Sequence, residues 1–432
     1  MKTVVKNIKS LVQVEDKARK FVRGKEMSEV KTIDNAFLLI EDDKIADFGT
    51  MDNCPNADKE VDAKDRMVLP TFCDSHTHLV YAGSREIEYI DKIKGLSYEE
   101  IAQRGGGIIN SALRLQQTSE EELYEDAMQR LNTIIKYGTG AVEIKSGYGF
   151  TTEAELKMLR VIRKLKENSS LTIKANFLGA HGVPLEYKNN VDAFVDKIVE
   201  EMIPKVADEG LADFIDVFCE KGCEAFPSCI GRSCKIYDTC ELGFFSVEQT
   251  ERILNEGVKR GLRPKIHANE LGASGGIQVG VKYNALSVDH LEYTGEEEIQ
   301  CLLNSNTMPT ILPGAAFFLN MPYAPARKMI EAGLPIAMAS DFNPGSSPSG
   351  NMQLVLTFAC VNYRLLPQEA INATTINTAY AMDVVDSLGS ICKGKKANFF
   401  ITTKIPTLEY LPYSYGENKV YKTFLNGKEV VF

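Results

Sequence analysis

Two histidines one residue apart, His76 and His78, follow an apolar segment that begins at Met67. Alternate side chains of a β-strand point to the same face, so these two imidazoles would converge on one point beyond the strand. Neutral imidazole is the commonest metal ligand in proteins and suits both zinc and iron. The pair therefore indicates half of a metal site; two surface histidines are the alternative.

The chain contains only five histidines, and the other three also stand in or just after apolar runs. They are His181, His267 and His290. If those runs are neighbouring strands of one sheet, their ends meet at one edge and the imidazoles gather there. This common placement favours one metal centre over scattered surface positions.

Strands alternate with helices between residues 66 and 384, a pattern that is typical of parallel α/β folds. Amphipathic segments such as 152–168, with apolar residues at near-helical spacing, separate the strand candidates. Eight such units predict a closed (β/α)₈ TIM barrel. The eight strand candidates are residues 68–75, 140–145, 172–180, 213–219, 264–269, 285–290, 308–314 and 335–341.

Both ends of the chain are rich in predicted β-strands. Residues 35–50 indicate two strands around an Asp-Asp turn, and Asn426-Gly427 is a strong hairpin signal. Each end is too short to form a stable unit alone. We therefore expect residues 1–65 and 385–432 to pair into a small composite β-sandwich domain beside the barrel of residues 66–384.

Composition excludes several classes of function. A net charge of −10 argues against a nucleic-acid groove or an anionic membrane surface, because both need basic patches. No apolar run approaches the roughly 20 residues of a membrane span. The first residues lack a signal-peptide core, so the ten cysteines indicate thiols in a reducing cytoplasm.

The polar residues that follow the predicted strands would all lie on one rim, because TIM-barrel chemistry sits at the C-terminal ends of the strands. Every histidine of the protein falls in this group. In strand order the group is His76 and His78, Tyr148, His181, His267 with Glu270, His290, and Asp341.

Hydrolysis by a metal-bound water is the chemistry that fits this group. His76, His78 and His267 with Asp341 would supply three nitrogens and one oxygen and leave a position open for water. Glu270 could take the proton of that water and pass it to a leaving nitrogen. His290 could hold a developing oxyanion or share the proton. Alternatives remain, because Asp341 could cap the next helix, and Tyr148 and His290 could be structural.

The longer motifs around these residues resemble the amidohydrolase superfamily and, within it, the imidazolonepropionase family. The likeness covers nearly the whole chain, and the combination of motifs is far more specific than H-x-H alone. The motifs are HTHLVYAGSR (76–85), SYEEIAQRGGGI (97–108), EIKSGYGF (143–150), FLGAHGVP (177–184), HANELG (267–272), DHLEY (289–293) and SDFNPGSSP (340–348).

The resemblance implies ring opening of 4-imidazolone-5-propanoate to N-formimidoyl-L-glutamate in histidine degradation, by a homodimer with one zinc or iron ion per subunit. Metal-bound hydroxide would attack the cyclic amide carbonyl. Glu270, His290 and Asp341 would be the catalytic residues, with the assignment of each proton transfer left open. The implied metal ligands are His76, His78, His267 and Asp341, and the implied substrate contacts are Arg85, Tyr98, Tyr148, His181, Glu270, Asn343, Gly345 and Ser346.

The substrate's carboxylate would suit Arg85, because guanidinium binds carboxylates at two points. A solvated surface arginine is the alternative. The RGGGI segment could be only a flexible loop, since no P-loop lysine follows it.

Three features depart from this family pattern, and one of them, Asn398 where the family usually has Asp, lies far from the site in sequence. Glu220 directly follows the fourth predicted strand, where a carboxylate could bridge a second metal ion. Residues 223–243 look like an insertion on the catalytic rim, which suggests part of a lid or a subunit contact. Its cysteines fit the C-x₂₋₄-C spacing of zinc sites poorly, so free thiols are favoured. These are Cys223, Cys229, Cys234 and Cys240.

Three other functions compete with this interpretation. A cyclic amidohydrolase or deaminase of the same superfamily would share the metal and the base but would not need Arg85 for a free carboxylate. A non-catalytic barrel scaffold usually lacks one or more metal ligands, and here all four candidates are present. A cysteine-based redox protein would need a C-x-x-C motif, which the chain lacks.

Overall fold

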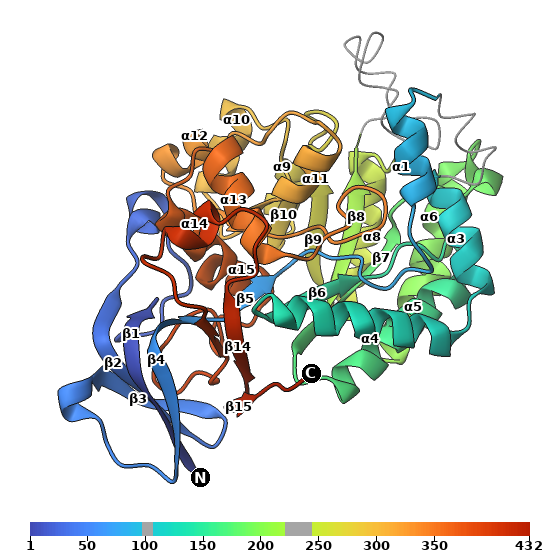
Figure 1. Ribbon diagram of the computed structural model, residues 1–432. Coiled ribbons are helices and arrows are strands. Elements are labelled where there is room, and N and C mark those ends of the chain that lie inside the picture. The colour runs from blue at the N-terminus through green and yellow to red at the C-terminus, as the bar shows by residue number, and fades with distance from the viewer. Residues whose placement is uncertain (97–106, 221–243) are drawn as a thin grey trace.

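The computed structural model describes residues 1–96, 107–220 and 244–432. Tyr98 and the insertion of residues 223–243 therefore lie outside the described residues. The described chain forms an eight-stranded parallel barrel with helices around it and a separate sheet at one side (Figure 1). No helix in these three stretches is long and apolar enough to span a membrane.

The barrel strands follow one another in chain order, and each of the eight predicted segments overlaps one of them. The ring closes where Thr77 bridges Phe342, with the His78 amide donating to the Phe342 carbonyl at 2.9 Å. The predicted TIM barrel is confirmed. Its strands are β5 (Phe72–Asp74), β6 (Thr139–Lys145), β7 (Thr172–Ala180), β8 (Phe214–Cys219), β9 (Arg263–Ala268), β10 (Ser287–His290), β11 (Met308–Ile311) and β12 (Ala337–Met338).

The first predicted strand is divided in the structure. Residues Val68–Pro70 belong to β4 (Lys59–Pro70), which pairs with β13 (Phe399–Thr402) outside the barrel. Only Phe72–Asp74 pairs with β6 in the barrel. The chain thus passes at Thr71 from one sheet into the other, and His76 and His78 follow within seven residues.

Both ends of the chain build one seven-stranded sheet, in the order β15-β14-β13-β4-β1-β2-β3 (Figure 1). The two predicted turns are present, with left-handed backbone at Asp42 (φ 58°) and at Asn426 and Gly427 (φ 50° and 74°). The strands not yet given are β1 (Lys2–Val12), β2 (Thr32–Glu41), β3 (Lys44–Thr50), β14 (Val420–Leu425) and β15 (Lys428–Glu429).

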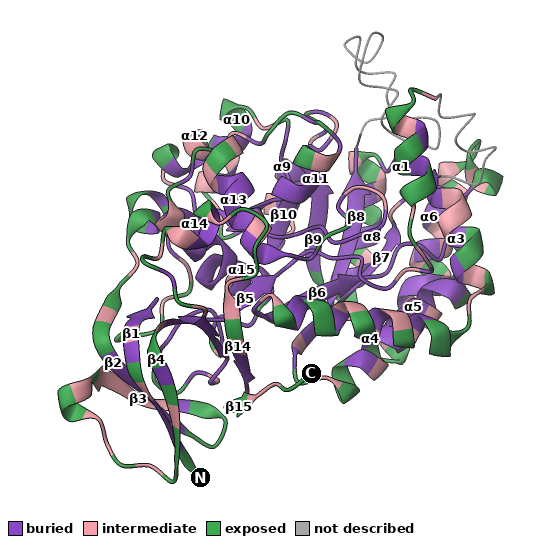
Figure 2. Ribbon diagram, viewed as in Figure 1, coloured by how far each residue is buried: buried purple, intermediate pink, exposed green. Residues whose placement is uncertain are grey.

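Most of the helices bury one face against the barrel and leave the other in solvent (Figure 2). In α5, the Thr151 hydroxyl caps the first turn and Leu156, Leu159 and Ile162 are buried. The helices are α1 (Glu86–Ile93), α3 (Gly107–Gln117), α4 (Glu120–Lys136), α5 (Thr152–Asn168), α6 (Val191–Lys197), α7 (Ile203–Asp208), α8 (Val247–Lys259), α9 (Gly276–Lys282), α10 (Glu296–Leu303), α11 (Pro313–Phe318), α12 (Ala326–Ala332), α13 (Met352–Asn362), α14 (Pro367–Thr374), α15 (Ile376–Ala381) and α16 (Tyr410–Tyr413).

Candidate metal centre and active site

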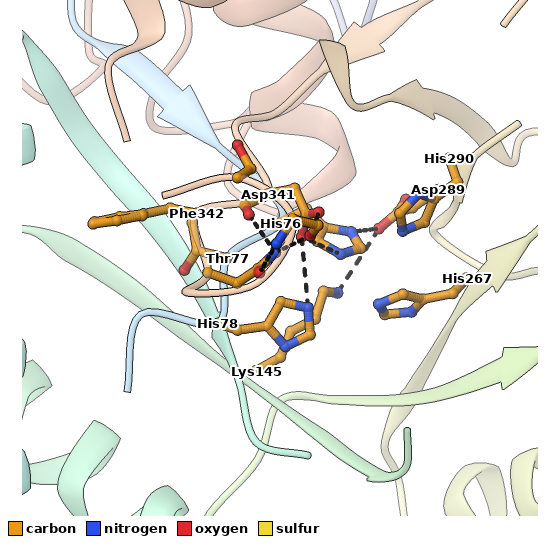
Figure 3. A network of polar contacts seen from close by, with 12 residues as sticks. His76, Thr77, His78, Lys145, His267, Asp289, His290, Asp341 and Phe342 are labelled. Atoms are coloured by element: carbon orange, nitrogen blue, oxygen red, sulfur yellow. Dashed lines mark hydrogen bonds and ion pairs between the residues drawn. The ribbon is translucent and has the colours of Figure 1, made fainter. Parts of the chain in front are cut away.

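The structure brings the four expected metal ligands together at the C-terminal ends of the barrel strands (Figure 3). His76 and His78 follow β5, His267 lies near the end of β9, and Asp341 follows β12. The Asp341 carboxylate (Oδ1) lies 3.5 Å from His76 Nε2 and 3.7 Å from His78 Nε2. The rings of His76 and His267 are 4.5 Å apart between centroids.

Two buried carboxylates fix the orientation of two of these histidines. His76 Nδ1 lies 2.6 Å from Asp289 Oδ2, and His267 Nδ1 lies 2.9 Å from Asp216 Oδ1. A carboxylate accepts hydrogen bonds, so each Nδ1 carries the proton and each Nε2 keeps its lone pair. Within the described residues, neither Nε2 has a hydrogen-bond partner although both are buried.

This donor set fits a metal cation. Burial is the main cause that lowers the pKa of His76 and His78 well below 6.5, so both imidazoles are neutral and can donate a lone pair. Burial also raises the pKa of Asp341 to about 6. A cation between these atoms would partner the unpaired nitrogens and stabilise the carboxylate.

Glu270 lies beside His290 on the same rim. Its carboxylate (Oε2) is 3.5 Å from His290 Nε2. Burial, followed by the nearby carboxylates of Glu292, Asp341 and Glu220, raises the pKa of Glu270 well above 4.5. A carboxyl group with a raised pKa is suited to take up and release a proton near neutral pH.

Glu220 holds the segment that carries Glu270. Its carboxylate accepts hydrogen bonds from the backbone amides of Glu270 (2.6 Å) and Leu271 (3.2 Å) and from the Ser274 hydroxyl. In the described part of the chain, Glu220 belongs to none of the side-chain groups that could hold a metal ion. Its contacts therefore favour a positioning role for Glu220 over that of a second-metal ligand.

Tyr148 and His181 line the cavity beside the metal ligands. The His181 ring stacks on His78 with centroids 4.8 Å apart, and its Nδ1 donates to the Gly147 carbonyl at 3.1 Å. Burial lowers the pKa of His181 to about 3 and raises the pKa of Tyr148. Both side chains are thus neutral and present polar groups to a substrate.

Arg85 also lines this cavity. Its Nε and Nη2 each lie 2.6 Å from Glu88 Oε2, which fixes the plane of the guanidinium. Gly345 packs against this group, and a side chain at position 345 would collide with Arg85 Nη1. Although burial of Glu88 opposes ionisation, Arg85 and Lys92 lower its pKa to about 2, so Arg85 faces a permanent anion.

Asn343 and Ser346 organise the loop after Asp341. The Asn343 side chain accepts from the amides of Gly345 and Ser346, both at 2.8 Å, and donates to the Asp341 carbonyl at 2.7 Å. The Ser346 hydroxyl lies 3.0 Å from Asp341 Oδ2. These contacts hold the Asp341 carboxylate in place. The side-chain amide of Asn343 makes its hydrogen bonds within the loop itself.

The expected residues that the structure describes line one cavity of about 110 Å³, apart from His76, which is fully buried. Lys92, Ile108, Phe218, Leu271 and Leu319 complete its wall. Sequence reasoning did not single out these side chains. Ile108, Phe218, Leu271 and Leu319 are apolar, and such residues give no chemical signal in a sequence.

Sequence reasoning also missed the buried charges beneath the site. Five ionisable side chains of the barrel strands are fully buried there: Glu143, Lys145, Asp216, Lys265 and Asp289. A signal existed, because charged residues inside otherwise apolar strands are rarely buried without a partner.

Comparison with known proteins agrees with this fold. The model of the amidohydrolase family matches residues 67–430. Imidazolonepropionases from Christiangramia forsetii and Flavobacterium johnsoniae are 55% and 53% identical over 99% of this chain and 100% of their own length. The imidazolonepropionase of Thermoanaerobacter pseudethanolicus is 41% identical over 92% of this chain and 90% of its own.

Solved structures share the fold at much lower identity. A 5-methylcytosine deaminase from Klebsiella pneumoniae, liganded with phosphonocytosine, aligns with a TM-score of 0.71 at 16% identity over 100% of this chain and 98% of its own. A guanine deaminase from C. acetobutylicum with bound guanine gives a TM-score of 0.69 at 15% identity, with both chains fully covered. The family model and the full-length relatives together establish that this chain belongs to the amidohydrolase family, among the imidazolonepropionases.

Proposed function

We propose that this protein hydrolyses 4-imidazolone-5-propanoate to N-formimidoyl-L-glutamate, the ring-opening step of histidine degradation. Identity of 53–55% over the full chain to imidazolonepropionases carries the proposal. The geometry supports it, because a metal-ligand set lies at one cavity that a candidate base and a half-buried arginine also line.

One zinc or iron ion would be held by His76, His78, His267 and Asp341. When bound, such an ion acidifies a water molecule and polarises the substrate carbonyl. The fit rests on the unpartnered Nε2 atoms of His76 and His267 and on the Asp341 carboxylate between His76 and His78. Imidazole and carboxylate accept both metals, so availability would decide between zinc and iron.

Glu270 would carry the proton of the reaction. Its carboxylate takes a proton from the attacking water as the new C–O bond forms at the ring carbonyl carbon. It then returns the proton to the ring nitrogen as the C–N bond breaks. His290, 3.5 Å from Glu270, would donate a hydrogen bond to the developing oxyanion.

Turnover of competing substrates tests this function. Purified protein should hydrolyse freshly prepared imidazolonepropanoate, followed by loss of its ultraviolet absorbance, and should leave cytosine and guanine unchanged. Deamination of either base without turnover of imidazolonepropanoate would assign the site to a deaminase instead.

Replacement of Arg85 by alanine should raise KM for imidazolonepropanoate about 10- to 100-fold, because a hydrogen bond to a charged group contributes roughly 1.5–3 kcal/mol. Arg327→Ala is the matched control, since Arg327 pairs with Glu369 but lies outside the cavity. Steady-state kinetics of both variants give the result. An unchanged KM in Arg85→Ala would favour a substrate without a carboxylate.

We further propose that the protein acts as a cytoplasmic homodimer. The family resemblance supports the dimer, and the six described cysteines, all free thiols, are compatible with a reducing compartment. Light scattering should then give twice the chain mass of 47.9 kDa.

A further inference from the structure

We propose that Lys145 is a positioning residue that aims two of the metal-binding histidines at once. The inference rests on the metal site of the proposed function. Lys145 ends β6 beneath the rim, and its side chain is fully buried. Figure 3 shows its ammonium group between the rings of His78 and His267 in this view, joined by a dashed line to Asp289.

The ammonium group contacts both carboxylates that hold the histidines. Its Nζ donates to Asp216 Oδ2 at 2.8 Å, and the other oxygen of Asp216 holds His267. The same Nζ lies 3.8 Å from Asp289 Oδ2, the oxygen that holds His76. One cation therefore sits behind two carboxylate–histidine pairs that come from different strands.

Neighbouring groups leave Lys145 little freedom to move. Its Nζ also donates to Glu143 Oε1 at 2.6 Å. The Asn176 amide bridges Glu143 (2.8 Å) and Asp216 (2.9 Å) from the next strand, β7. The position of Asp216 is thus determined by Lys145 and Asn176 on one side and by His267 on the other.

A second buried lysine completes the network from below. Lys265 Nζ donates to the carbonyl oxygens of Ser75 (2.9 Å) and Ala381 (3.3 Å) and pairs with Glu143. Its distance to Asp289 Oδ2 is 3.9 Å, and within the described residues it forms no ion pair or hydrogen bond with Asp216. Both lysines therefore lie near Asp289, but of the two only Lys145 also pairs with Asp216 in the described part of the chain.

The charges of the network and the metal site complement one another. Two ammonium groups face three carboxylates, and Asp341 adds a fourth above them. Two negative charges thus remain for a divalent cation to neutralise. Without Lys145 three would remain, and both carboxylates would be free to turn away from the histidines, because buried charges need partners in fixed places.

Removal of the ammonium group tests the inference through metal binding. In Lys145→Met, Zn²⁺ affinity should fall about 10- to 100-fold, as it does when other residues that hold metal ligands in place are replaced. Competition with a chromogenic chelator measures this affinity. The visible spectrum of the Co²⁺-substituted protein should also change, because His76 and His267 move. kcat of the zinc-loaded variant should fall more than KM rises.

The matched control is Lys395→Met. Lys395 is a buried, hydrogen-bonded lysine of the terminal region, and its Nζ donates to Leu388 and Ser390. Its loss should lower the melting temperature while leaving Zn²⁺ affinity and the Co²⁺ spectrum unchanged. If Lys145→Met does not fold, Lys145→Gln serves, because it removes the charge but keeps an N–H donor.

Wild-type Zn²⁺ affinity and an unaltered Co²⁺ spectrum in a folded Lys145 variant would overturn the inference. Failure of the wild-type protein to bind Zn²⁺, Co²⁺ or iron would instead overturn the proposed metal site. The two failures are therefore distinct.

Discussion

Replacement of Glu270 by glutamine should lower kcat for imidazolonepropanoate about 10²- to 10⁴-fold, the usual contribution of a general base. Glutamine keeps the size of the side chain but cannot carry a proton between water and the leaving nitrogen. Because Glu270 is none of the proposed metal ligands, metal content should stay at the wild-type value. Rapid kinetics together with metal analysis of the same sample give both results.

Glu292→Gln is the comparison for this variant. Glu292 is also a buried carboxylate and lies 3.8 Å from His290, but it does not line the cavity. Its replacement should lower kcat much less than replacement of Glu270 does. A Glu270→Gln variant with near-normal kcat would show that another group carries the proton.

Replacement of His267 by alanine should abolish tight metal binding and activity together. His267 is expected to supply one of three nitrogen ligands, so its loss should weaken binding by more than the 10- to 100-fold typical of an outer-shell change. It would also leave Asp216 without its histidine partner. Metal analysis after gel filtration, and calorimetric titration with Zn²⁺, measure the effect.

His181→Ala separates a ligand from a substrate contact. His181 belongs with His78 and His267 to one group whose atoms lie within 4.8 Å, so it competes on geometry for a place in the ligand set. We expect His181→Ala to keep its metal and to raise KM, because His181 faces the cavity and stacks on His78. If His181→Ala lost its metal and His267→Ala retained it, His181 would be the metal ligand and His267 the substrate contact.

The sequence predicted the barrel because each strand is a short apolar run between amphipathic helices. It also predicted where the site lies, because His76, His267 and Asp341 follow or end such runs and the ends of parallel strands meet on one rim. The division of the first strand at Thr71 could not be predicted, since Val68–Pro70 is as apolar as the barrel strand after it.

The network beneath the site was harder to predict for a different reason. Lys145, Asp216 and Asp289 belong to three strands far apart in the sequence, and only the closed barrel brings them together. Asn343 illustrates the same limit: its type suits a substrate contact, but its amide is engaged within its own loop. Residue type and spacing thus located the rim but not the hydrogen bonds made on it.

Hydrolysis of imidazolonepropanoate before and after removal of the metal tests the central claim most directly. The purified protein should lose activity on dialysis against a strong chelator and regain it on addition of one equivalent of Zn²⁺ or Fe²⁺ per chain. Circular dichroism should confirm that the metal-free protein stays folded. Undiminished turnover by folded protein shown to contain no metal would contradict the account.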